Sequence, residues 1–266
     1  MLNSEKSSTQ GWKEGFTEKW HEKGKRLNDF IRPATFPIAV KLFRRSADFP
    51  EKVRSPFGNL GIKVPICQAL SMVRMYGWTI GMTGKDSINC AGKVVLGWRT
   101  PNDEETLLNG WVQAGFMEDK VAAKRTFDSI YKFPDGEFEG LVMSPLEKTK
   151  IEPDLIMIYC NPAQIIPLIH STLSKEGGRL NFSSQTAVAS CSDGIAQTIL
   201  KEKPNLVLPG VGDRAFAMTR EDELIFTIPS SMIDIVLDGL GVAYKKGLSR
   251  YPVPIYLRYQ ASLPWE

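Results

Sequence analysis

Three cysteines stand where a thiol could do chemistry. Cys67 lies near an expected helix start, Cys90 in a glycine-bearing turn, and Cys191 directly before another expected helix. If these thiols converge in space, the softness of thiolate selects Zn²⁺, copper or an iron–sulfur cluster over Mg²⁺ or Ca²⁺. Three thiolates without a fourth suit a site with one open or non-cysteine position. We therefore interpret Cys67, Cys90 and Cys191 as metal ligands.

Spacing alone does not identify this site. The separations between the three cysteines are long and match no compact motif such as C-x₂-C, so the fold must bring them together. At the start of its helix, Cys67 would feel the positive end of the helix dipole, which is expected to lower the thiol pKa. Structural thiols, simple redox thiols and a thiol enzyme with one nucleophilic cysteine remain the alternatives.

Other residues fall at boundaries between expected elements. Asn161 and Gln164 stand at a helix start directly after a strand, and Asp213 and Arg214 follow the glycines of GVGDR. We predict that these four border the pocket as cofactor-binding residues, although Asn161 and Gln164 also suit a helix cap and Asp213 and Arg214 suit surface pairing. GVGDR lacks the remaining residues of a Walker or dinucleotide motif.

Cys160 and the two histidines favour structural roles. Cys160 ends the apolar run LIMIYC and is interpreted as a core residue, although it could instead complete a four-thiolate set. His21 lies on an exposed-looking opening helix and His170 at the border of a helix face. With no G-x-S-x-G elbow either, a Ser-His-Asp triad has little support.

Composition excludes several classes of function. The 266 residues include 33 basic and 30 acidic side chains, a net charge of +3, which gives no reason to expect a nucleic-acid or membrane partner. No apolar run approaches the roughly 20 residues of a membrane span. The first ten residues lack the apolar stretch of a secretion signal. We expect a cytoplasmic protein with free or metal-bound thiols that acts with a small molecule or a redox partner.

Hydrophobic patterns predict α+β or mixed α/β architecture, with a central mixed sheet flanked by helices in a single globular unit. Residues 1–10 are expected to form a disordered tail and residues 11–266 one domain, with two subdomains possible around 145–155. Helices are expected over 12–31, 66–76, 101–116, 117–133, 161–178, 194–201 and 230–247. Strands are expected over 36–43, 78–82, 93–98, 140–145, 154–160, 205–208 and 223–229.

Several strings in order resemble a known family: FPIAVKLF, C-Q-A, D-S-I-N-C-A-G-K-V-V-L-G, N-P-A-Q, A-S-C-S-D-G-I-A-Q and L-P-G-V-G-D-R. The chain is similar, over roughly residues 36 to 252, to the uncharacterised prokaryotic family designated domain of unknown function 169, also labelled ArCR. The resemblance singles out Cys67, Cys90 and Cys191. It also implies that many members carry another cysteine in the loop 208–212, where this chain has none.

These observations favour a cytoplasmic, cysteine-ligated metal or iron–sulfur protein with a redox-related role. The alternative is a small-molecule or cofactor-binding protein whose thiols are structural. The sequence assigns no reaction, so whether the protein is an enzyme is left open.

Overall fold

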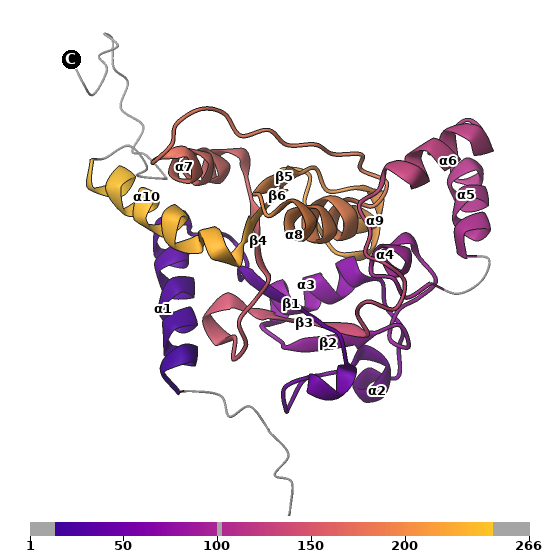
Figure 1. Cartoon of the computed structure of the whole chain (residues 1–266), viewed down its shortest axis with the longest axis horizontal. Coiled ribbons are helices and arrows are strands. Elements are labelled where there is room, and N and C mark those ends of the chain that lie inside the picture. The colour runs from indigo at the N-terminus through magenta and orange to yellow at the C-terminus, as the bar shows by residue number, and fades with distance from the viewer. Residues whose placement is uncertain (1–13, 100–102, 247–266) are drawn as a thin grey trace, which may run out of the picture.

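A sheet of six strands runs through the middle of the protein (Figure 1). The computed structural model describes residues 14–99 and 103–246. The strand order is β2-β3-β1-β4-β6-β5, and each of the five pairings is antiparallel. The strands are β1 (Ile38–Phe43), β2 (Ile80–Thr83), β3 (Gly140–Pro145), β4 (Leu155–Cys160), β5 (Asn205–Val207) and β6 (Leu224–Pro229).

Helices cover both faces of this sheet. The α-helices are α1 (Glu14–Ile31), α2 (Pro56–Leu60), α3 (Ile66–Tyr76), α4 (Ala91–Val95), α5 (Asp103–Gln113), α6 (Lys120–Ser129), α7 (Pro162–Leu173), α8 (Gln197–Lys201), α9 (Val211–Phe216) and α10 (Ile233–Lys245). A π-helix, η3 (Ala189–Ala196), leads directly into α8. Short 3₁₀ turns are η1 (Ser46–Asp48), η2 (Leu146–Lys148) and η4 (Ser230–Met232).

Strand alternation divides the core into two halves. Successive side chains of a strand point to opposite faces of the sheet, and in β4 Met157 and Tyr159 pack with one cluster while Ile158 and Cys160 pack with the other. We call the face that carries Tyr159 the thiol face, because Cys191 belongs to the same cluster. The face that carries Cys160 is the opposite face.

Different helices cover the two faces. On the thiol face, buried residues of α3, α4 and η3 pack against the strands, with α5 and α6 at the edge of the cluster. On the opposite face, α1, α7 and α10 contact one another and bury their apolar stripes, and Figure 1 shows these three helices grouped together. The sheet therefore stands between two separate sets of helices.

The structure confirms the expected central sheet flanked by helices. Because the five strand pairings are all antiparallel, the fold is α+β rather than mixed α/β. The expected strands 36–43, 140–145 and 154–160 correspond to β1, β3 and β4. The expected helix 66–76 is α3, which ends at Gly77 with φ +68°. Residues 1–10 and the start of the first expected helix lie outside the described residues.

The expected strand at residues 93–98 is wrong. This part of the chain belongs to α4 and the turn after it, with Val94, Val95 and Leu96 all buried. A short apolar run that is buried on every side has no periodicity to separate a strand from a helix. The correction places Cys90 at the N-cap of a helix.

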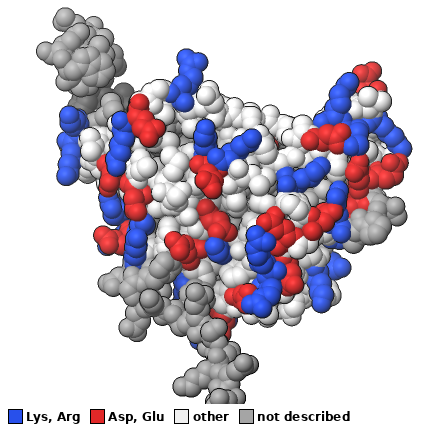
Figure 2. Space-filling model, viewed as in Figure 1, with Lys and Arg blue, Asp and Glu red and all other residues white. Residues whose placement is uncertain are grey.

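None of the helices in the described ranges is long and apolar enough to cross a membrane. Figure 2 shows basic and acidic side chains interspersed on the face in view. On α5 and α6 they form ion pairs: Lys124 contacts Glu104 at 3.4 Å and also pairs with Asp128. Exposed pairs of this kind contribute little stability, so the fold depends on its two buried clusters.

The contact between α7 and α10 depends on a glycine. A Cβ added at Gly239 would lie 2.7 Å from both the Cα and the carbonyl oxygen of Ser171, and backbone atoms cannot swing aside as a side chain can. We expect Gly239→Ala to lower the free energy of unfolding by about 1–3 kcal/mol because the helices must separate. Urea denaturation followed by far-ultraviolet circular dichroism measures this.

Gly241 in the same helix provides the matched control. A Cβ there meets only the ring of Phe30, at 3.8 Å, which is ordinary contact. Gly241→Ala should be neutral or stabilising by up to about 1 kcal/mol because alanine favours the helix. Equal denaturation midpoints for the two variants would contradict the close approach at Gly239.

Candidate functional site

The three cysteines of the proposed metal site come from three helix starts on the thiol face. Cys67 is in the first turn of α3, Cys90 is the N-cap of α4, and Cys191 is the third residue of η3. These helices contact one another: a Cβ added at Gly92 would lie 3.0 Å from the Cys191 Sγ and 3.0 Å from the Cδ1 of Ile66. The fold thus joins segments that are far apart in the chain.

A fourth segment, α9, closes over Cys67. The thiol of Cys67 donates to the carbonyl oxygen of Gly212 at 3.7 Å. The next residue, Asp213, is 3% exposed, and its Oδ2 accepts the N–H of Gly210 at 3.0 Å. Burial raises the Asp213 pKa, while hydrogen bonding to Ser190 and Gly210 opposes that rise. The structure therefore brings Asp213 to the thiols.

Burial keeps the thiols of Cys67 and Cys191 in their neutral form. Removal from water, with smaller contributions from the nearby Asp213 and Cys90, raises the pKa of Cys67 to about 12. Burial also raises the pKa of Cys191 well above its usual value, with Cys67, Cys90 and Asp213 adding to the effect. The expected net lowering of the Cys67 pKa at the helix start is wrong: the backbone of the first turn does lower this pKa, but burial raises it by more.

The expected position of Cys191 before a helix also needs correction. The helical segment begins at Ala189, so Cys191 lies inside it, and Ser192 and Asp193, whose side chains would suit the cap of a helix that began later, lie inside it as well. Instead, Ser192 Oγ accepts the N–H of Tyr131 at 2.9 Å, and Asp193 Oδ2 accepts the N–H of Gln185 at 3.0 Å. π-Helical turns are rare and are often found at functional sites.

Tyr159 is a site residue that the sequence analysis missed. It is 2% exposed, and its ring lies against the guanidinium of Arg74, with 4.0 Å from Cζ to the ring centroid. Burial raises the Tyr159 pKa well above its usual value, and Asp213, Cys67 and Cys191 raise it further while Arg74 opposes them. The signal was present in the sequence: strand alternation sets Tyr159 on the opposite side of β4 from Cys160.

The three thiols lie in adjacent helices but do not form a complete coordination sphere. Within residues 14–99 and 103–246, no group of three or more His, Cys, Asp or Glu side chains is arranged to hold a metal ion. Both histidines are exposed, and His21 Nδ1 lies 2.7 Å from the Glu147 carbonyl oxygen, on the side of α1. Ligation would require the cysteine side chains to turn toward a common centre.

Cys160 lies apart from the other three cysteines. It is 1% exposed and belongs to the cluster on the opposite face. Burial raises its pKa, with a further contribution from Glu223. Because the sheet separates it from Cys191, Cys160 is a packing residue in this fold.

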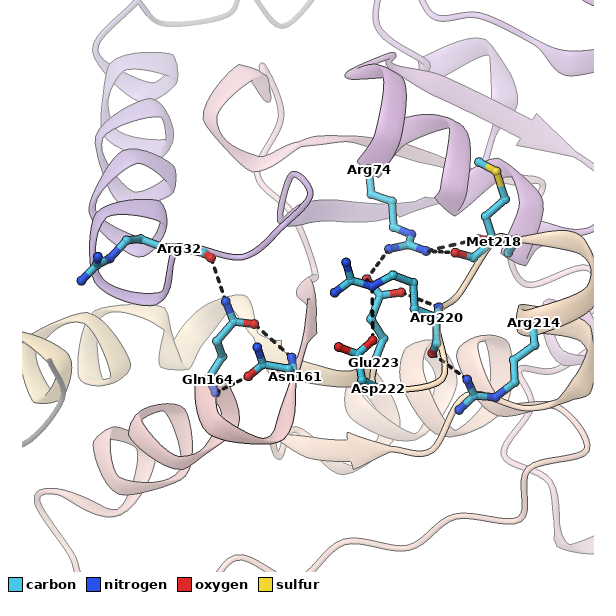
Figure 3. A network of polar contacts seen from close by, with 10 residues as sticks. Arg32, Arg74, Asn161, Gln164, Arg214, Met218, Arg220, Asp222 and Glu223 are labelled. Atoms are coloured by element: carbon cyan, nitrogen blue, oxygen red, sulfur yellow. Dashed lines mark hydrogen bonds and ion pairs between the residues drawn. The ribbon is translucent and has the colours of Figure 1, made fainter. Parts of the chain in front are cut away.

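Asn161 and Gln164 are used in a helix cap. Asn161 Oδ1 accepts the N–H of Gln164 at 2.9 Å, and Gln164 Oε1 accepts the N–H of Asn161 at 3.0 Å. The amide of Gln164 also donates to the carbonyl oxygen of Arg32 at 2.7 Å, tying α7 to the end of α1 (Figure 3). α7 packs on the opposite face, so the structure does not bring these two residues to the thiols.

Arg214 also points away from the buried site. It is exposed, and its guanidinium donates to the carbonyl oxygen of Arg220 at 2.6 Å. GVGDR is the start of α9 rather than the turn that its glycines suggested, with Gly210 as the N-cap. Asp213 and Arg214 are adjacent in sequence but lie in different surroundings.

A buried ion pair fixes the segment after α9. The Arg74 guanidinium donates to Glu223 Oε1 at 3.0 Å and to the carbonyl oxygens of Ala217 and Met218 at 3.2 and 3.1 Å (Figure 3). Both charged side chains are almost fully buried. Arg74 thereby connects α3, which carries Cys67, to the chain that follows Asp213.

Loss of this ion pair should destabilise the whole fold. Arg74→Met leaves the buried Glu223 with only the exposed Arg220, 4.0 Å away, as a cation and frees two carbonyl groups, so we expect the free energy of unfolding to fall by about 3–5 kcal/mol. Urea denaturation measures the change. Arg45→Met, which breaks the exposed pair with Asp48, should cost less than about 1 kcal/mol. Equal effects of the two substitutions would contradict the central role of Arg74.

The metal-free protein should show unequal thiol reactivity. At about pH 8 a thiol with a pKa of about 12 is ionised in about one molecule in ten thousand, so native Cys67 should resist iodoacetamide. Cys191 and Cys160 should resist it as well, whereas the half-buried Cys90 should react first. Mass spectrometry of timed samples reports the order.

Denaturant provides the control for this measurement, because in the unfolded chain all four cysteines should react at similar rates. Native Cys67 that reacts as fast as native Cys90 would show that α9 does not cover it.

Comparison with known proteins agrees with the resemblance seen in the sequence. The profile of the family described as uncharacterised ArCR, domain of unknown function 169, matches residues 26–239, which include all four cysteines. No curated protein matches the chain, and no solved structure does. Since the family match spans well over half of its length, the chain belongs to the uncharacterised ArCR family, domain of unknown function 169.

Proposed function

We propose that this protein binds a thiophilic metal ion or an iron–sulfur cluster through Cys67, Cys90 and Cys191, and uses it in a redox-related role with a small-molecule or protein partner. The observation that carries the proposal is the meeting of three helix starts, each bearing a cysteine, on one face of the sheet. Thiolate ligands favour zinc, copper and iron–sulfur clusters.

The charge balance of the site supports a cation. Besides burial, neighbouring acidic groups raise the pKa of both thiols: Asp213 and Cys90 act on Cys67, and Cys67, Cys90 and Asp213 act on Cys191. A buried cluster of acids stays protonated unless a positive charge enters. A bound metal supplies that charge, displaces the thiol protons and draws the ligands together.

The backbone around the cysteines also suits a negatively charged ligand set. The N–H groups of the first helical turn point toward the helix start and favour anions. For Cys67, hydrogen bonds from the backbone of Gln68 and of Cys67 itself already act in this direction. A reducing compartment such as the cytoplasm would keep these thiols available for ligation.

One observation favours the alternative, a small-molecule-binding protein with structural thiols. A cavity of about 420 Å³ lies beside β2 and α2, a volume within the usual range for ligand pockets. Its charged lining includes Lys52, Lys85 and Asp86, but none of the cysteines. The carboxylate of Asp86 already accepts hydrogen bonds from the hydroxyl groups of Ser55 and Thr83 and from backbone N–H groups, so its role is to hold these segments together.

Metal analysis of alanine variants tests the proposal. Protein purified without oxygen should carry metal, with visible absorbance if the group is an iron–sulfur cluster. Cys67→Ala, Cys90→Ala and Cys191→Ala should each lose most of that metal, because three ligands are too few to spare one. Elemental analysis and the visible spectrum provide the readouts.

Cys160→Ala is the matched control. It removes a buried thiol of the same chemistry from the opposite face, so it should retain the metal content of the wild type. Equal metal content in all four variants, or a metal-free wild type after anaerobic purification, would overturn the proposal in favour of structural thiols.

A further inference from the structure

The hydroxyl group of Tyr159 lacks a hydrogen-bond partner within the described residues although it is buried. Buried tyrosine hydroxyl groups normally find one, because an unpaired polar group away from water is costly. Each such exception calls for an explanation, and a bound water, ion or small ligand is one. The surroundings of Tyr159 point to that explanation.

Two polar neighbours of Tyr159 also keep buried atoms without a hydrogen-bond partner within the described residues, namely Arg74 Nε and Asp213 Oδ1. Arg74 presents its flat face to the tyrosine ring and directs its terminal N–H groups to Glu223 and two carbonyl oxygens. Asp213 Oδ2 accepts the N–H of Gly210. Asp213, Cys67 and Cys191 lie close enough to the phenol to raise its pKa. Three buried polar atoms around this point, the Tyr159 hydroxyl, Asp213 Oδ1 and Arg74 Nε, are therefore available to a bound group.

The ligand count of the proposed metal site leaves a position for such a group. Three cysteines on a tetrahedral metal, or on a four-iron cluster, leave one coordination position open. Cys160 cannot fill it, because it lies across the sheet.

We propose that the open position takes a small exogenous ligand with a lone pair, such as water, hydroxide or a small anion, and that Tyr159 donates a hydrogen bond to it. This inference rests on the proposed metal site and names what that site binds. Tyr159 is then a ligand-binding residue rather than a metal ligand. Its orientation is fixed by Arg74, which is held in turn by Glu223.

Cobalt and azide provide the test. Co²⁺ added to the metal-free full-length chain should give near-ultraviolet charge-transfer bands from thiolate, and azide should then shift the visible bands of the bound cobalt. Tyr159→Phe should keep the charge-transfer bands but bind azide roughly 10-fold more weakly, because a hydrogen bond to a charged ligand is lost. Tyr76→Phe, an exposed tyrosine on α3, should bind azide like the wild type.

The possible results distinguish failure of the metal site from failure of the exogenous ligand. Wild-type protein without charge-transfer bands would overturn the metal site itself. Full charge-transfer bands with no response to azide, or equal azide affinity in Tyr159→Phe, would overturn only the exogenous ligand. Loss of the charge-transfer bands in Tyr159→Phe would also overturn it, because Tyr159 would then be a metal ligand or a support of the fold. Circular dichroism of that variant separates these two cases.

Discussion

The guanidinium of Arg74 meets four parts of the chain at one buried point. It extends from α3, stacks on Tyr159 of β4, holds the carbonyl groups that follow α9 and pairs with Glu223 at the start of β6. Removing two charges from water is costly, and only good geometry with further hydrogen bonds compensates for it. Such a pair adds little net stability, but any conformation that separates its two charges is strongly destabilised. The cost of separating Arg74 from Glu223 therefore helps to fix the relative positions of Cys67, Tyr159 and Asp213.

Two opposing effects act on the thiols, and their sizes decide the outcome. A helix N-terminus favours thiolate by about 0.3–1 kcal/mol, or about 2 in partly buried sites. The Cys67 pKa rises from 9.0 to about 12, which corresponds to roughly 4 kcal/mol against the charged form. Burial therefore prevails, and the thiol is neutral at pH 7 in both the folded and the unfolded chain. In the proposed metal site, the bound cation would have to offset the cost of ionising this thiol.

Much of the fold follows from local patterns in the sequence. The alternating residues of β1, the apolar run of β4 between Pro153 and Pro162, and the stop of α3 at Gly77 each show their structure within a short stretch. The predicted elements differ from the structure where the local sequence pattern fits more than one element. The buried run around Val94 has no period, and the glycines of residues 210–212 suit a helix start as well as a turn.

The site itself depends on contacts that no local pattern reveals. Nothing in the sequence states that Gly92 lies against Cys191, or that the chain after α9 returns to Arg74. The three cysteines were selected by their positions at element boundaries, and the fold brings those boundaries together with Asp213. Asn161 and Gln164 met the same criterion, but α7 carries them to the other face. Position at a boundary therefore selects candidates, and the side of the sheet decides which of them can meet.

The alternation of side chains along β4 also sets the number of thiols at the proposed site. Tyr159 and Cys160 are adjacent in β4, paired with Ile225 and Leu224 of β6, and so face opposite ways. A slip of one residue in this register would exchange them and place a fourth thiol beside Cys67 and Cys191. Four thiolates would close a coordination sphere, whereas three thiolates with a phenol leave it open. The register is fixed by Ile156 and Ile158 on one face and by Met157 on the other, all buried. Ordinary strand packing thus determines that the proposed site is open, although none of those residues touches a ligand.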